Sequence, residues 1–222
     1  MFQGRNLVDE LMQRPDAVLI LEQLKEKLSE EQRRREAFYK LDDEDLKAEF
    51  VNGEIFYQPS VPKEHIDAVG AIACLLNIFT SAFHLGYVGI ERILTQFTRN
   101  DYLPDVCFFK QDKAADFKKG QLIFPVPDLV VEVLSKSSKR MMEHDTVTKY
   151  ADYEKHGVPE YWIVDPDEQT VSQYVLENGK YRLVLKSGEG TIRSFVVEGF
   201  AIPIRAIFDE EANLAAVREM FK

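Results

Sequence analysis

The sequence predicts an α/β protein whose core has the order helix, three strands, helix, strand between residues 63 and 165. Three observations support this order. A largely apolar stretch with helical periodicity follows Pro62, short apolar segments separated by polar loops come next, and a second helical stretch precedes the apolar run EYWIV. Such an alternation forms a sheet covered by helices, and its last crossover is expected to be right-handed.

Residues 16–37 are expected to form the first helix, with Asp16 as a possible N-cap. One face carries Leu21, Leu24 and Leu28 among many charged residues. So narrow a stripe suits a helix that lies on the domain or on a second copy of the chain. The arginine run at 33–35 is interpreted as a solvated face rather than as a DNA contact.

Turn signals divide the rest of the chain. Asn52-Gly53 and Asn178-Gly179 each predict a β-hairpin, and the helix after Pro62 is expected to stop near Gly86. We predict strands at 87–97, 102–109, 128–134 and EYWIV, a helix at about 140–156 that ends at Gly157, and a terminal helix at 211–220. A polar loop with Lys113, Lys118 and Lys119 precedes the strand at 128–134.

Composition narrows the possible functions. The 222 residues carry a formal net charge of −10, which argues against a protein that coats nucleic acid, because that affinity comes from Lys and Arg. A nuclease also places carboxylates beside phosphate and uses a divalent cation to make this tolerable, so total charge does not exclude one. With no long uncharged apolar run and no secretory signal, we expect a soluble, cytoplasmic protein without membrane contact.

Zinc and thiol chemistry are not indicated. Cys74 and Cys107 lie in apolar runs without a Cys-x-x-Cys pair, and both are expected to be core thiols. The four histidines, at positions 65, 84, 144 and 156, lack the close spacing of zinc ligands.

Two acidic residues interrupt strands that otherwise look buried. Glu132 lies in the middle of LVVEVL and Asp105 in YLPDVCFF. A buried carboxylate must be protonated, paired with a cation or bound to a metal, and two on neighbouring strands match the oxygen ligands of a hard divalent cation. For Glu132 a buried salt bridge with a later lysine stays an alternative, and Asp105 alone could be a turn residue. Asp128 is expected to start or cap its strand.

At this point the chain resembles the Uma-two family, candidate restriction endonucleases of the PD-(D/E)XK nuclease superfamily. The resemblance covers about residues 36–208, and its most specific blocks are PDLVVEVLS and GVPEYWIVD. The other matching positions are EFVNGEI from Glu49, Pro59-Ser60, His65, Pro104-Asp105-Val106, Asp145, Lys149 and Tyr153.

The resemblance implies a restriction-endonuclease-like core of helix, three strands, helix and strand, with added β-hairpins. It also implies that Asp105 and Glu132 bind Mg²⁺ (or Mn²⁺). Glu49 could reach the metal through water or pair with a surface cation. His65 could line the site, although a satisfied structural histidine near a helix start is favoured. Residues 1–35 lie outside the resemblance, so we predict an N-terminal helical extension at 1–35 and a nuclease domain at 36–222.

The catalytic lysine of the superfamily normally stands two residues after the glutamate, where this chain has Leu134. Two candidates could replace it. Lys136 shares the strand parity of Glu132, but SKSSKR looks like a strand end. Lys149 lies at i+4 from Asp145 and i−4 from Tyr153 on one helix face, and we favour it over a plain Asp145–Lys149 surface pair.

Together these features predict a metal-dependent endonuclease that hydrolyses DNA phosphodiester bonds with Asp105, Glu132, Lys149 and Glu49. The lysine would orient the attacking water or neutralise charge on the phosphate, and the loop lysines and residues 136–140 would follow the DNA backbone. The alternatives are an inactive nuclease fold that binds DNA or a protein, and an interaction protein that uses its first helix. A homodimer is also possible.

Overall fold

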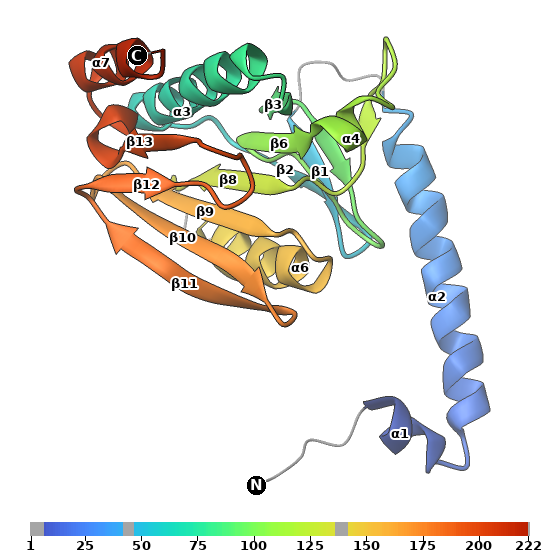
Figure 1. The fold of residues 1–222 in the computed structure, drawn as a ribbon. Helices are drawn as coiled ribbons and strands as arrows, with labels where there is room; N and C mark the ends of the chain where they lie inside the picture. The colour runs from blue at the N-terminus through green and yellow to red at the C-terminus, as the bar shows by residue number, and fades with distance from the viewer. Residues whose placement is uncertain (1–6, 42–46, 136–141, 222) are drawn as a thin grey trace, which may run out of the picture.

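The computed structural model describes residues 7–41, 47–135 and 142–221 of the chain. A rounded body carries one long helix that stands away from it (Figure 1). The helices are α1 (Leu7–Met12), α2 (Ala17–Phe38), α3 (Lys63–Ala82), α4 (Gln111–Ala114), α6 (Tyr150–Lys155) and α7 (Glu210–Glu219), with a π-helix η1 (His144–Lys149) and a 3-10 helix η2 (Ile204–Ile207).

Three sheets contain the strands. The six-stranded sheet has the order β11 (Lys180–Ser187), β10 (Thr170–Glu177), β9 (Glu160–Asp165), β8 (Leu129–Val133), β6 (Val106–Lys110), β3 (Gly86–Ile90). The five-stranded sheet has the order β2 (Glu54–Tyr57), β1 (Ala48–Val51), β5 (Asp101–Tyr102), β4 (Leu94–Gln96), β7 (Ile123–Phe124). Strands β12 (Thr191–Arg193) and β13 (Ala201–Pro203) pair separately.

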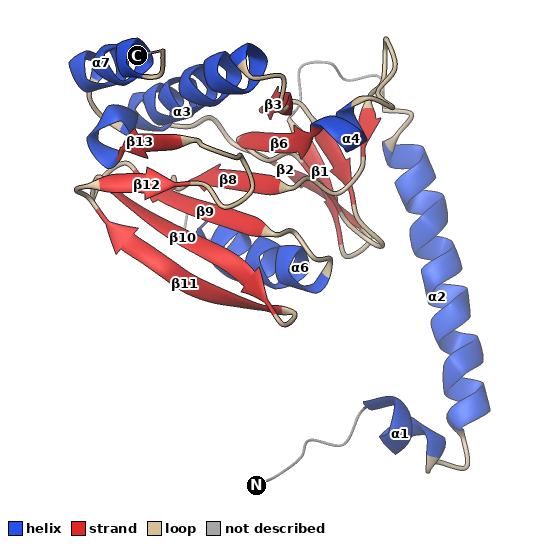
Figure 2. Cartoon of the chain, in the orientation of Figure 1, coloured by secondary structure: helices blue, strands red, loops and turns tan. Residues whose placement is uncertain are grey.

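The predicted core order is confirmed: α3, β3, β6, β8, η1 with α6, and β9 follow one another along the chain. Neighbouring strands of the six-stranded sheet run antiparallel except β8 and β9, which are parallel and are joined by the crossover that contains η1 and α6. Figure 2 shows α3 and α7 on one face of this sheet and α6 on the other.

The alternation of side chains along β8 decides where Glu132 points. Leu129, Val131 and Val133 pack in the main core with α3, whereas Val130 packs with Tyr153 on the opposite face. Successive strand residues face opposite sides. Glu132 therefore points toward the layer of η1 and α6.

Both predicted hairpins form through left-handed turn residues. Asn52 and Gly53 have φ values of 51° and 86° between β1 and β2, and Asn178 and Gly179 have 52° and 76° between β10 and β11. Two consecutive positive φ values match the twist of the strands that they connect.

Two predicted strands were wrong as single elements. The segment 87–97 forms β3 and β4, which lie in different sheets and are separated at Glu91, where φ is 55°. The segment 102–109 is divided into β5 and β6 around Pro104, a residue without an N–H group for a strand ladder.

Other expectations need correction at the residue level. Arg35 is 5% exposed rather than part of a solvated face, and Cys74 is an exposed residue of α3 rather than a core thiol. Lys113 donates hydrogen bonds to Val126 and Asp128, so it supports the start of β8. The expectation that Asp128 starts or caps its strand is confirmed. Asp128 directly precedes β8, and its carboxylate accepts a hydrogen bond from the Lys110 N–H.

Among the described helices, α3 is the one whose length and composition would suffice to cross a membrane. Half of its apolar window is buried inside the protein, where it packs on the six-stranded sheet. Its apolar character is therefore explained by the core.

Candidate functional site

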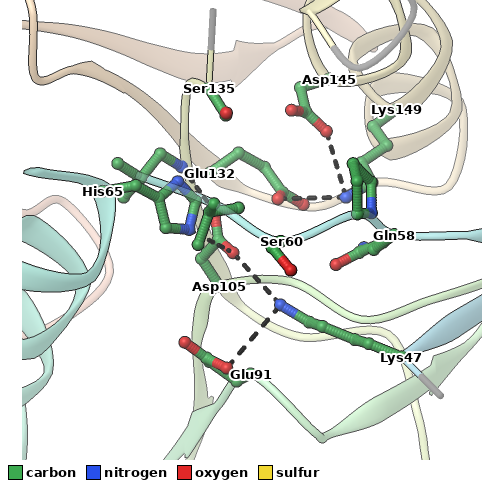
Figure 3. A pocket seen from close by; sticks show the side chains of 13 residues that line it. Lys47, Gln58, Ser60, His65, Glu91, Asp105, Glu132, Ser135, Asp145 and Lys149 are labelled. Carbon is green, nitrogen blue, oxygen red and sulfur yellow. Dashed lines mark hydrogen bonds and ion pairs between the residues drawn. The ribbon is translucent and has the colours of Figure 1, made fainter. Parts of the chain in front are cut away.

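The sheet brings Asp105 and Glu132 together. β6 and β8 are antiparallel with Val106 opposite Val131, so one further step of the register places Asp105 beside Glu132. The N–H group of Val133 donates to Asp105 Oδ2 at 2.7 Å and fixes that carboxylate. Both acids line one pocket of about 470 Å³, as Figure 3 shows.

Lys149 extends from the helical layer into this pair of strands. Its Nζ lies 3.1 Å from Glu132 Oε2, 3.1 Å from Glu49 Oε1 and 3.2 Å from Asp145 Oδ1, and its side chain is 1% exposed. The expectation that the Lys149 side chain can reach the neighbouring strand is confirmed by its contact with Glu132 on β8. Its pair with Asp145 is buried, not on the surface. Lys136 lies outside the described residues.

A π-helical turn positions Asp145 and Lys149. Six residues, His144–Lys149, adopt the wide π geometry before α6 continues as an α-helix. Tyr161 of β9 donates its hydroxyl hydrogen to the backbone carbonyl of Asp145 at 2.9 Å and so ties this turn to the sheet. π-helical turns occur frequently at functional sites.

Glu49 belongs to β1 of the five-stranded sheet and is fully buried. Oε1 accepts a hydrogen bond from the Leu103 N–H at 2.8 Å, and Oε2 lies 2.7 Å from His144 Nε2. Of the two alternatives for Glu49, pairing with a surface cation was wrong, because its partners Lys149 and His144 are both buried. No local pattern pointed to His144 as a partner of Glu49, because 95 residues separate the two.

Asp105 has a second set of neighbours at the open side of the pocket. Its Oδ1 lies 3.6 Å from Lys47 Nζ and 3.4 Å from His65 Nε2. His65 is 4% exposed, and neither ring nitrogen has a hydrogen-bond partner within the described part of the chain. His65 therefore lines the site, and the expectation of a satisfied structural histidine was wrong. Sequence reasoning did not find Lys47.

Among the described residues of this region, carboxyl groups outnumber lysines. We call Glu49, Asp105, Glu132 and Asp145 the acidic cluster. Burial raises the pKa of Glu132 well above its usual value, and the neighbouring acids act in the same direction against Lys149. Burial also raises the pKa of Asp145.

The other members of the site favour their charged forms. Burial disfavours the charge on Lys149, but Glu132, Glu49 and Asp145 outweigh it and hold the lysine pKa well above its usual value. Burial likewise opposes ionisation of Glu49, yet Lys149 and His144 lower the pKa of this carboxyl. Burial opposes ionisation of Asp105 as well, yet the nearby His65 and Lys47 lower the pKa of this carboxyl. One buried lysine thus faces more carboxylate than it can neutralise.

The donor atoms fit a hard divalent cation. Asp105, Glu132 and Asp145 line the same pocket with carboxylate oxygens, and Asp145 Oδ1 is buried without a hydrogen-bond partner among the described residues, although Lys149 is close to it. In the described ranges, no group of three His, Cys, Asp or Glu side chains is already arranged to hold one metal ion. Cation binding therefore requires these carboxylates to turn from the lysines toward a common centre.

Comparison with known proteins assigns the family. The sequence pattern of the Uma2 (Uma-two) family, described as "Putative restriction endonuclease", matches residues 35–205. The chain belongs to the Uma2 family. A comparison with curated proteins gives no match.

A solved structure supports the same fold. The crystal structure of "a putative nuclease belonging to DUF820" from Anabaena variabilis ATCC 29413 is similar with a TM-score of 0.65 at 20% sequence identity. The similarity covers 77% of this chain and 94% of that one. The Uma2 chain therefore has a restriction-endonuclease-like α/β fold, and its family supports a nuclease function.

Proposed function

We propose that this Uma2 protein is a divalent-metal-dependent endonuclease that hydrolyses phosphodiester bonds of DNA in the cytoplasm. The observation that carries the proposal is the meeting of Asp105, Glu132 and Lys149 in one pocket, from three separate elements of a nuclease-family fold. The lysine absent from position 134 is supplied from the helix beyond the strand.

Asp105 and Glu132 are the proposed ligands of Mg²⁺ or Mn²⁺, with Asp145 as a further oxygen donor. When bound, the cation would polarise the phosphate and lower the pKa of the attacking water. Asp105 is prepared for this role because the Val133 N–H fixes one of its oxygens and leaves Oδ1 toward the pocket. Tyr153 similarly fixes Glu132 by donating to Oε1 at 2.8 Å.

Lys149 is the proposed catalytic cation. Its Nζ is part of the pocket wall beside Glu132, where it can donate a hydrogen bond to the attacking water or to a phosphate oxygen. Glu49 holds Lys149 from behind and does not line the pocket. We therefore assign Glu49 to positioning of Lys149 together with His144, rather than to metal contact.

The test is cleavage of supercoiled plasmid DNA in Mg²⁺ or Mn²⁺, with calorimetric titration of each metal in parallel. We expect cleavage by the wild type and none by Asp105→Asn or Glu132→Gln, both of which keep the side-chain size. Metal binding without cleavage would support an inactive nuclease fold instead. Wild-type cleavage by both variants would refute the site.

A further inference from the structure

We call residues 7–30, which comprise α1 and the first part of α2, the arm. The arm carries an apolar surface that the body does not cover. The C-terminal part of α2 is anchored to the body through Glu31, Arg35 and Phe38, which are buried. Arg35 donates to both carboxylate oxygens of Asp101, at 2.6 and 2.7 Å, and Arg99 pairs with Glu31 at 2.7 Å. On the N-terminal side of Glu31 the helix stands away from the body (Figure 1).

The buried face of α2 continues onto this free part of the helix. Upstream of Glu31, Arg35 and Phe38, the same spacing of three and four residues runs through Leu28, Leu24, Leu21 and Ala17. We call Ala17, Leu21, Leu24 and Leu28 the seam. The three leucines are 49%, 49% and 39% exposed. Alternating three- and four-residue spacing is the pattern by which helices pair side by side.

The arm exposes further large apolar side chains. Leu7, Met12, Val18 and Leu19 are between 60% and 71% exposed. Single exposed apolar residues are ordinary, but the concentration of so many on one short arm indicates an interaction site. Within the described ranges the body leaves the seam leucines uncovered, since residues 21–30 are all exposed.

We propose that the seam binds the seam of a second copy of the chain, with the two α2 helices antiparallel. Its spacing is four, three and four residues, which reads the same in both directions. A two-fold axis between residues 22 and 23 therefore sets Ala17 against Leu28 of the second copy and Leu21 against its Leu24. Such a self-complementary surface is what a two-fold homodimer requires.

The charges beside the seam are compatible with this pairing. In the antiparallel register Lys25 lies on the same flank of the seam as Val18 of the second copy, and Lys27 lies on the same flank as its Ile20. The lysines avoid one another, and their aliphatic stems can cover these apolar residues. A parallel pair would instead bring both bodies to the same end of the helix pair, where each body already covers the continuation of that face at Glu31, Arg35 and Phe38.

The size of the surface sets the strength of the dimer. Residues 17–28 span roughly 18 Å of helix at about 1.5 Å per residue. This length buries less than the roughly 800 Å² per partner of a standard stable interface. The dimer is therefore weak enough to dissociate on dilution, and we assign residues 7–30 to self-association rather than to the nuclease site.

The first test is the molar mass of the full chain by light scattering, from low to high micromolar concentration. We expect the mass to approach that of a dimer at high concentration, and the double variant Leu21→Glu/Leu24→Glu to stay monomeric. The matched control is Leu183→Glu, since Leu183 is similarly exposed at 47% but lies on β11. A monomeric wild type at high concentration, or a dimeric double variant, overturns the proposal.

The second test determines the orientation by disulfide trapping in a Cys74→Ser background, because Cys74 is exposed. Ala17→Cys and Leu28→Cys are oxidised separately and as a mixture. We expect efficient crosslinking only in the mixture. Crosslinking of each variant with itself would show a parallel pair and overturn the antiparallel arrangement.

Discussion

Lys149 is the cation on which the acidic cluster depends. It contacts Glu49, Glu132 and Asp145, all at least 93% buried in their side chains, and is itself almost completely buried. A lysine in this position links a proposed catalytic role to folding, because the same ammonium group also pairs with three buried carboxyl groups. Variants of the site therefore change stability as well as activity.

Lys149→Met should lower the free energy of unfolding by about 3–5 kcal/mol, the cost of leaving buried charges without their partner. Urea denaturation at neutral pH measures this change. Lys149→Arg keeps the charge and serves as the control, with a smaller loss. Equal stability of Lys149→Met and the wild type would mean that the cluster is already neutral without the lysine.

The pKa of Glu132 predicts how stability depends on pH. Burial and the neighbouring acids raise the pKa of Glu132 in the folded state above 4.5, so the folded protein binds this proton more tightly than the unfolded chain. The contribution of Glu132 to stability is therefore greatest below pH 4.5 and declines as the pH rises through the raised pKa.

Glu132→Gln should remove this decline. Unfolding measured at several pH values should show the variant gaining stability relative to the wild type as the pH increases from acid to neutral. Glu22→Gln, at an exposed residue of α2, controls for effects of net charge. A difference that does not change with pH would contradict the raised pKa.

At the scale of elements, the loop before β5 holds α2 through Arg35. Its guanidinium group binds Asp101 and also the backbone carbonyls of Phe97, Thr98 and Asn100. The Tyr39 hydroxyl group donates a further hydrogen bond to Asp101 Oδ2 at 2.9 Å. This contact fixes the angle at which α2 leaves the body.

Asp101→Ala should release the helix, because it leaves the buried Arg35 without its carboxylate at a cost of about 3–5 kcal/mol. We expect faster proteolytic cleavage between α2 and β1 and a lower midpoint of denaturation. Glu22→Ala on the exposed part of α2 provides the control. Unchanged proteolysis in Asp101→Ala would show that the remaining contacts, among them Phe38 and the Arg99–Glu31 pair, hold the helix without Asp101.

For the whole molecule, the excess of acidic residues in the pocket predicts stabilisation by divalent cations. A cation that binds only the folded state at about 100 times its dissociation constant adds about 2.7 kcal/mol to stability. Thermal unfolding should therefore shift upward in Mn²⁺ or Mg²⁺ for the wild type. The shift should be absent in Asp105→Asn and unaffected by Leu21→Glu/Leu24→Glu, which lies outside the site.

The sequence by itself determined the order of the core elements, both hairpins and the two acids of the central strands. Each of these features depends on residues that are close together in the sequence. This holds for helical and strand periodicity, for Asn-Gly turns, and for a carboxylate within an apolar run. The same reasoning placed Asp145 and Lys149 on one helical face, because four-residue spacing is a local property.

Only the tertiary structure decided which of these residues meet. The partners of Glu49 lie 95 and 100 residues away, at His144 and Lys149, and the partner of Arg35 lies 66 residues away. Such contacts depend on strand register and on the packing of one layer against another, which no local pattern contains. For the same reason the leucine stripe of α2 was visible in the sequence, whereas only the fold showed that the body leaves it uncovered.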